Sequence, residues 1–275
     1  MESKGRKGVS SRIEVVSRLN RARISAALSQ GKREDGRGLS DLRAVKIKKN
    51  VLDKAEGSAE VLLGDTRVIV GVKIDKGEPF SDTPNQAVLT VNAEFTPIAS
   101  PAFEPGPPDE ASVELARVVD RGIRSSEAID LEKYCIVPGK IVYVIFVDIF
   151  ILNHSGNLID ASALASVAAL MSTKLPKYTF KEDKLEFLEA HEPLELQDLP
   201  ITVSIGKIGD NLIVDPTMDE EDIMDTRVTV AVNKNGYICA LQKSGSAGLD
   251  LEEVKKATNI ACEKATEIRK LLMES

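Results

Sequence analysis

One nearly continuous apolar segment constrains the fold of this 275-residue chain more than any other feature. Residues 140–152, KIVYVIFVDIFIL, are almost all β-branched, aromatic or otherwise apolar. The segment is too short to cross a membrane as a helix, and its composition is typical of a central strand that is buried on both faces. We therefore expect a sheet with strands on both sides of this segment and other layers packed against it.

The segments around this strand predict strands followed by a helix, twice over. Residues 44–95 show β patterns separated by Gly, Asp and Pro, and predict a meander of strands. Asp160 is predicted to cap a helix that is rich in Ala and Ser, which allows close packing on a sheet. The second series has strands at about 200–215 and 226–243, and an amphipathic helix from Leu251 onward.

A short repeat favours a duplicated fold. DTRVIVGV at 65–72 and DTRVTVAV at 225–232 share six of eight residues, which would place Arg67 and Arg227 at equivalent points of two strands. A chance match between valine-rich strands is the alternative. The predicted fold class is α+β with duplicated strand-then-helix halves. The predicted division is a basic N-terminal helical extension (1–32), a first half (33–185) and a second half (186–275).

The charge is distributed unevenly along the chain. Residues 1–49 carry 14 Lys and Arg against 5 Asp and Glu, whereas the whole chain has a net charge of -7. This basic arm is either a solvated, partly helical extension or a contact for nucleic acid or a partner. Ser11 and Glu14 form a capping-box pattern that predicts a helix over residues 11–30. Three widely spaced cysteines and no run of about 18 apolar residues predict a cytoplasmic protein with no membrane contact.

A cluster of acids precedes the second copy of the repeat. Five carboxylates lie between Asp219 and Asp225, and crowded oxygen ligands are what magnesium needs beside phosphate. Arg227 would neutralise these acids without binding metal. The cluster therefore indicates a phosphoryl-transfer site that has lost its catalytic function, and we expect no metal and no cofactor. An acidic turn paired with Arg227 is favoured over loose cation binding at Glu221.

Several motifs, taken in order, resemble the ribonuclease PH family. They are REDGR at 33–37, GSA at 57–59, GDT at 64–66, DTPNQ at 82–86, FEPGPPDE at 103–110, ELARVVDRGIR at 114–124 and ASVAAL at 165–170. The combination of EPGPPDE, ARVVDR and DEEDIMD is most similar to non-catalytic ribonuclease PH-like subunits of the archaeal exosome.

The resemblance implies a ribonuclease PH fold, which is ribosomal protein S5 domain 2-like. It also implies a place in a hexameric ring, a trimer of heterodimers formed with a catalytic ribonuclease PH-like sister subunit. Such a ring degrades single-stranded RNA from its 3′ end with inorganic phosphate, and RNA-binding cap proteins join it.

Two departures from the family pattern imply that this chain has no catalytic residues. Active members hold the attacking phosphate with a Gly-Thr-Arg turn, and the matching residues here are Gly156, Asn157 and Leu158. Active members also present two acids to a metal, at positions that match Glu221 and Arg227. Phosphorolysis needs a placed nucleophile and charge stabilisation. The alternatives are an active phosphate-dependent 3′ to 5′ exoribonuclease and a binding module unrelated to RNA decay.

A predicted amphipathic helix carries a row of arginines. Arg117, Arg121 and Arg124 lie at i, i+4 and i+7, so they form one positive stripe. Guanidinium groups in register can bind successive phosphates without base specificity, and we predict these three as RNA-binding residues. Salt bridges within the helix or at an interface are the alternative. For Arg33 and Arg37, a structural salt bridge and an RNA contact remain equally open.

Overall fold

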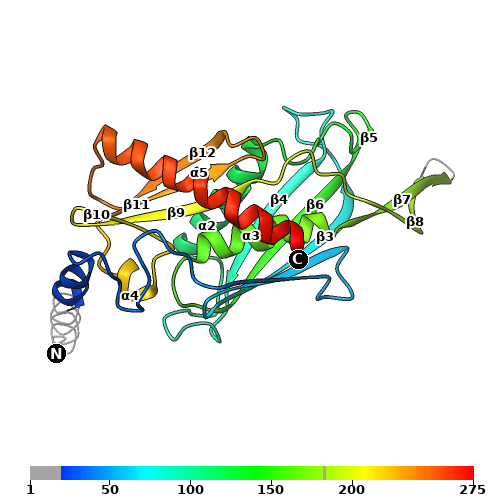
Figure 1. Ribbon diagram of the computed structural model, residues 1–275. Coiled ribbons are helices and arrows are strands. Elements are labelled where there is room, and N and C mark those ends of the chain that lie inside the picture. The colour runs from blue at the N-terminus through cyan, green and yellow to red at the C-terminus, as the bar shows by residue number, and fades with distance from the viewer. Residues whose placement is uncertain (1–19, 182–183) are drawn as a thin grey trace, which may run out of the picture.

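The computed structural model describes residues 20–181 and 184–275, which form three sheets and the helices that pack on them (Figure 1). The largest sheet has the order β1-β2-β3-β6-β4, with β5 added beside β6. Its strands are β1 (Val45–Lys49), β2 (Gly57–Leu63), β3 (Thr66–Gly77), β4 (Val88–Phe95), β5 (Cys135–Val137) and β6 (Ile141–Asn153). The second sheet, β10-β9-β11-β12, comprises β9 (Ile201–Ile208), β10 (Asn211–Val214), β11 (Thr226–Val232) and β12 (Ile238–Ser244).

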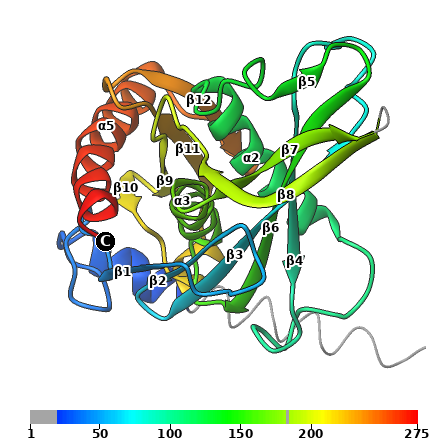
Figure 2. The ribbon, with the colours of Figure 1, turned by 90° about the vertical axis from the view of Figure 1, so that its right-hand side faces the viewer.

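The helices pack on these two sheets, some between them and one on the outer side of the second sheet. They are α2 (Glu110–Ser125), α3 (Leu158–Met171), α4 (Met218–Glu221) and α5 (Leu251–Glu274). Figure 2 shows α3 end-on between the sheets, with α5 on the outer side of the second sheet. Every residue from Leu158 to Leu170 is buried, because the small Ala and Ser side chains let both sheets approach the helix.

The structure confirms that residues 140–152 form a central strand and corrects two details. β6 pairs antiparallel with β3 and parallel with β4, so β4 is not the next strand of a meander. Only one face of β6 is fully buried: Ile145 and Val147 are inaccessible, whereas Val144 and Phe146 are half-buried. The apolar run therefore overstates burial on the second face.

The repeated sequence marks equivalent strand starts. β3 begins at Thr66 and β11 begins at Thr226, so Arg67 and Arg227 are both the second residue of their strand. Each threonine hydroxyl donates to a backbone carbonyl, that of Gly156 at 2.6 Å and that of Ser244 at 2.8 Å. The equivalence predicted for the two arginines is confirmed.

The N-terminal helix is present where the structure describes it. Residues 20–28 are helical, and the earlier part of the helix predicted over residues 11–30 lies outside the described residues. Ile24 and Leu28 are each 1% exposed and pack with Ile213 and Ile223, so this helix is fastened to the second half. In the described part of the chain, no helix combines the length and apolarity needed to cross a membrane.

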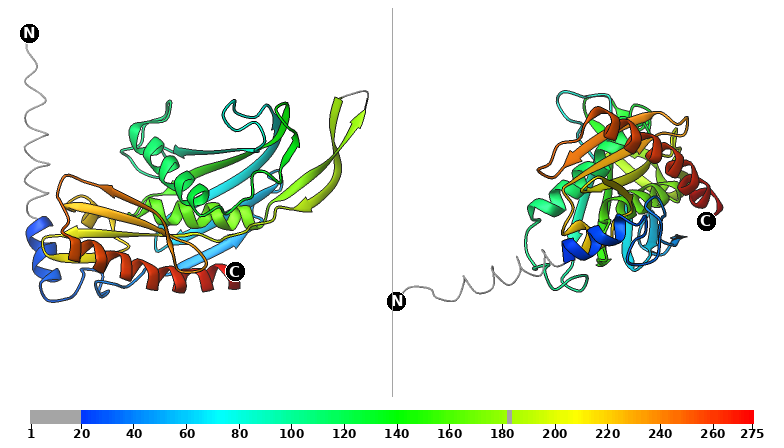
Figure 3. Two further views of the ribbon diagram at one scale, coloured as in Figure 1. Left: turned by 90° about the horizontal axis from the view of Figure 1, so that it is seen from above. Right: turned by 60° about the vertical axis from the view of Figure 1, so that its left-hand side comes forward.

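One hairpin was not predicted. β7 (Lys174–Lys181) and β8 (Lys184–Pro193) pair with each other alone, and Figure 3 shows them projecting from the body of the molecule. The apolar residues of this segment are interspersed with many charged ones, and we expected no strand there. Phe187 nevertheless packs on Tyr143 of β6, with the ring centroids 5.8 Å apart, and this contact anchors the base of the hairpin.

Candidate functional site

The turn between β6 and α3 forms the floor of the candidate site. Gly156 has φ of 89°, and a Cβ there would lie 2.5 Å from the backbone nitrogen of Met218. Only glycine therefore lets this turn approach the start of α4. Leu158 is the first helical residue of α3 and is 8% exposed. The side chain that matches the phosphate-binding arginine of the family pattern is thus apolar and buried, and it cannot bind an anion.

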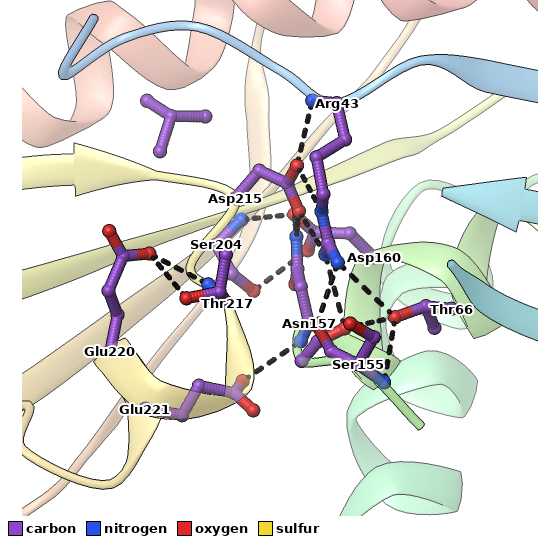
Figure 4. Close-up of polar contacts among 12 residues, drawn as sticks. Arg43, Thr66, Ser155, Asn157, Asp160, Ser204, Asp215, Thr217, Glu220 and Glu221 are labelled. Atoms are coloured by element: carbon purple, nitrogen blue, oxygen red, sulfur yellow. Dashed lines mark hydrogen bonds and ion pairs between the residues drawn. The ribbon is translucent and has the colours of Figure 1, made fainter. Parts of the chain in front are cut away.

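Asp215 is the hub of a buried polar network (Figure 4). Its carboxylate has no exposed surface, and it accepts hydrogen bonds from the side chains of Arg37 (3.0 Å), Arg43 (2.7 and 2.9 Å) and Asn157 (2.8 Å). Burial by itself raises the pKa of Asp215, but the hydrogen bonds and charge of Arg43, with Asn157, outweigh it and hold the pKa below its ordinary value. Asp215 is therefore an ionised structural anchor between two arginines.

Asp160 does not cap α3, contrary to the prediction. Asn157 is the N-cap residue, and Asp160 lies inside the first turn. Its carboxylate accepts from the backbone nitrogen of Ser204 (2.8 Å), the hydroxyl of Ser204 (2.7 Å) and the amide of Asn157 (2.9 Å). Burial raises the pKa of Asp160 to about 6 against these hydrogen bonds. Asp160 thus links the start of α3 to the second sheet.

A carboxylate of the chain itself occupies the amino end of α3. Oε1 of Glu221, at the end of α4, accepts from the backbone N–H of Asn157 at 3.1 Å (Figure 4). Helix amino ends favour anions because their N–H groups lack partners within the helix. Burial raises the pKa of Glu221 to about 7, although Arg227 and this backbone bond lower it. Glu221, which matches one of the two acids of the family pattern, thus bonds the turn at the start of α3.

This burial predicts a pH-dependent stability. Between pH 4.5 and 7, the unfolded chain ionises Glu221 while the folded chain keeps the proton, so stability falls as pH rises through this window. Glu221→Gln removes the effect. Because the carboxylate is 18% exposed, we expect the wild type to lose about 2–3 kcal/mol relative to the variant across this window. Urea denaturation of both proteins at several pH values measures the difference, and parallel stability curves would contradict it.

Arg227 makes the surroundings of Glu221 unsuitable for a divalent cation. The guanidinium of Arg227 on β11 lies 3.5 Å from Oε1 of Glu221 and 3.9 Å from Oε1 of Glu114 on α2. A fixed positive charge at this distance repels a metal ion that would use the same carboxylate. Among the described residues, no three His, Cys, Asp or Glu side chains converge on a possible ion position.

The alternatives left open for Arg33 and Arg37 are decided by burial. The side chain of Arg33 has no exposed surface; its Nε donates to Oε1 of Glu220 at 2.8 Å, and its Nη1 donates to the carbonyl of Val214 at 2.6 Å. Arg37 is 13% exposed and bonds Asp35 and Asp215. Both arginines fasten the REDGR turn to the second half, so their role in the described chain is structural.

The three arginines predicted to bind RNA lie exposed on α2 and differ in their partners. Nη1 of Arg121 donates to Oε1 of Gln242 on β12 at 2.9 Å. Nε of Arg124 donates to both carboxylate oxygens of Asp120 at 2.8 Å, and its Nη2 donates to the carbonyl of Leu89. Arg117 contacts no acceptor among the described residues. It shares with Arg121 a groove between α2 and β12, whose other lining residues are Glu110, Val113, Glu114, Val118 and Gln242.

Sequence reasoning missed the connection between Arg43 and Asp215. The two are 172 positions apart, and Arg43 stands in no motif, so no local signal pairs them. Asp215 stands directly after a predicted strand and before Pro216, where extended backbone is favoured. Its φ of 51° lies instead in the left-handed region, which the sequence does not indicate.

Fold and site together define a class of protein: two sheets enclose a buried helix, and a buried polar network surrounds the amino end of that helix. The chain belongs to the 3′ exoribonuclease family, the ribonuclease PH family that the motifs resembled. The model of the first domain of this family matches residues 41–176, and that of the second domain matches residues 198–264. Both the recognition of the family and the predicted fold class are confirmed.

Individual relatives are similar over nearly the whole chain. The exosome complex component Rrp42 of Thermococcus onnurineus is 52% identical over 267 residues, covering 96% of this chain and 98% of the relative. Rrp42 of Methanopyrus kandleri is 47% identical over 259 residues, covering 94% and 97%. A chain of the Archaeoglobus fulgidus exosome, solved with RNA bound to the active site, aligns with a TM-score of 0.86 at 46% identity, covering 93% of this chain and 98% of that one.

Proposed function

We propose that this chain is a non-catalytic subunit of an archaeal-type exosome ring, which degrades RNA in the 3′ to 5′ direction. It scaffolds a catalytic ribonuclease PH-like sister subunit in a hexameric ring, a trimer of heterodimers, and lends arginines to the composite RNA site. The similarity to Rrp42 exosome components and to a chain of an RNA-bound exosome supports this assignment. The setting is cytoplasmic, and RNA-binding cap proteins bind the same ring.

One observation carries the non-catalytic part of the proposal. Leu158 is buried in the core, and the guanidinium of Arg227 lies 3.5 Å from Glu221. A phosphate nucleophile would meet no cation at the position of Leu158, and a metal ion would meet a cation where active members carry the second acid. Losing one placed electrostatic donor costs a rate factor of about 10² to 10³. Here the phosphate arginine and the second metal-binding acid are both replaced.

The groove between α2 and β12 supports the RNA-binding part of the proposal. Arg117 and Arg121 point from one helix face into this groove, and Arg117 has all of its donors free among the described residues. Guanidinium groups bind phosphate oxygens in pairs and do not read bases. Such contacts suit a complex that degrades single-stranded RNA of many sequences.

A reconstitution assay tests the proposed function. The purified chain, incubated with single-stranded RNA, inorganic phosphate and magnesium, is expected to release no nucleoside diphosphate. Addition of a catalytic ribonuclease PH-like subunit is expected to give a ring of defined mass and phosphate-dependent shortening of the RNA. Product release by this chain alone would establish an active exoribonuclease instead. A chain that stays monomeric and binds no RNA in the presence of the sister subunit would leave only a binding module of the same fold.

A further inference from the structure

Arg227 is poorly bonded compared with the other interior arginines. Its two ion pairs, with Glu221 at 3.5 Å and Glu114 at 3.9 Å, are at the long end of the range, and its buried Nε has no acceptor in the part of the chain that the structure describes. In contrast, Arg33 uses its Nε and both terminal nitrogens, and Arg43 bonds Asp215 and two backbone carbonyls. Arg227 therefore retains donors that another anion can use.

Arg227 adjoins the groove between α2 and β12 through Glu114, one of its lining residues, and we call this side the inner end of the groove. Arg227 pairs with Ser244 across β11 and β12, and two residues further along, Thr229 pairs with Gln242, the acceptor of Arg121. Its other neighbour is Glu114, which lines the same groove as Arg117 and Arg121. Arg227 thus extends the row of cations from the edge of the second sheet toward the amino end of α3.

The charges of the groove indicate what this extra cation does. The lining residues include two acids, Glu110 and Glu114, and two arginines, Arg117 and Arg121, so their formal charges cancel. Arg227 is the next cation inward. Its charge is incompletely neutralised, because its ion pairs with Glu221 at 3.5 Å and Glu114 at 3.9 Å are both long. A polyanion that reaches this end of the groove therefore meets a cation that can still accept a phosphate partner.

We propose that Arg227 is a further RNA-binding residue, which contacts a backbone phosphate at the inner end of the groove between α2 and β12. The same side chain that removes the second metal-binding acid of the family pattern thus supplies a phosphate contact. This inference rests on the proposed function, because it requires RNA to follow the groove of Arg117 and Arg121.

Arg227→Gln in the reconstituted ring tests the proposal, with Arg67→Gln as its matched control. Arg67 is the counterpart of Arg227 in the repeat, is 51% exposed and pairs with Glu60 outside the groove. With fluorescent oligonucleotide RNA, we expect Arg227→Gln to weaken binding about tenfold at low salt. We also expect it to make the slope of log affinity on log salt shallower by about 0.7, since one phosphate contact on a single strand is lost. The control is expected to match the wild type.

Three outcomes of this titration overturn the proposal. Unchanged affinity in Arg227→Gln, while Arg117→Ala with Arg121→Ala weakens binding, removes Arg227 from the site and leaves the proposed function intact. Weaker binding with an unchanged salt slope shows a structural effect only. If neither variant weakens binding, RNA does not follow this groove, and the RNA-binding part of the proposed function fails together with the inference.

A second pair of variants decides the question if Arg227→Gln does not assemble. Glu114 is 46% exposed and shares the guanidinium of Arg227, whereas Glu110 lines the same groove with no such contact. Glu114→Gln frees Arg227 and is expected to tighten RNA binding about threefold more than Glu110→Gln does. Equal effects of the two substitutions would show that only the net charge of the groove matters, and would overturn a direct contact by Arg227.

Discussion

Asp215→Ala is expected to lower the free energy of unfolding by about 3–5 kcal/mol, because it leaves buried charges without their partner. Asp215 has no exposed surface, and the arginines that it joins, Arg37 and Arg43, are 13% and 10% exposed. Removing the carboxylate deprives two guanidinium groups of their shared ionic partner and the amide of Asn157 of one acceptor. Chemical denaturation of the purified chain, followed by circular dichroism, measures the loss.

An exposed ion pair provides the control for this stability prediction. Asp120 pairs with Arg124 at i, i+4 on α2, where the two side chains are 29% and 40% exposed. Asp120→Ala is expected to cost only about 0.3–0.5 kcal/mol, because solvent already screens such pairs. Similar losses for Asp215→Ala and Asp120→Ala would show that the buried network contributes specificity of folding and little net stability.

Arg117→Ala combined with Arg121→Ala is expected to weaken RNA binding by the reconstituted ring on the order of 100-fold at low salt. Two charge-assisted hydrogen-bonded contacts of about 1.5 kcal/mol each give this magnitude. The salt dependence should also flatten, by about 1.4 in the slope of log affinity on log salt, because two phosphates are no longer neutralised. Fluorescence anisotropy with single-stranded RNA across a salt series measures both quantities.

Arg124→Ala is the comparison on the same helix. Its guanidinium already bonds Asp120 and the carbonyl of Leu89, so RNA would have to compete with these acceptors. We expect a smaller loss of affinity than for either Arg117→Ala or Arg121→Ala. If all three single variants bind RNA as tightly as the wild type while the ring still forms, the α2 arginines serve packing within the ring and not RNA.

Much of the fold was predictable because local patterns and tertiary contacts agree. The apolar run of residues 140–152 marks the central strand, and α2 and the long α5 carry apolar periodicities that match their burial. The parallel partnership of β4 and β6 was not predictable in this way, since strand order depends on how the connecting α2 crosses the sheet. The β7–β8 hairpin was missed although Leu175 and Leu185 are buried, because charged residues surround its few apolar positions.

Of the candidate site, the sequence could predict which residue types stand at the positions of the family motifs, but not the contacts that depend on tertiary packing. Leu158 and Arg227 can be recognised as departures because they stand at positions that the family motifs fix. The hydrogen bond from Asn157 to Glu221 could not be predicted, because it depends on how closely α4 approaches the β6–α3 turn. That approach depends in turn on Gly156, where any side chain would meet the backbone of residues 216–218.

The burial of Leu158 bears on evolutionary reversal. A single mutation to arginine at position 158 would bury a cation among apolar side chains. Burying a charge without a partner costs free energy, so the folded state would be destabilised. Arg227 would still stand beside Glu221. Under the proposed function, a single substitution is therefore expected not to restore a phosphate site, and phosphorolysis would remain with the sister subunit.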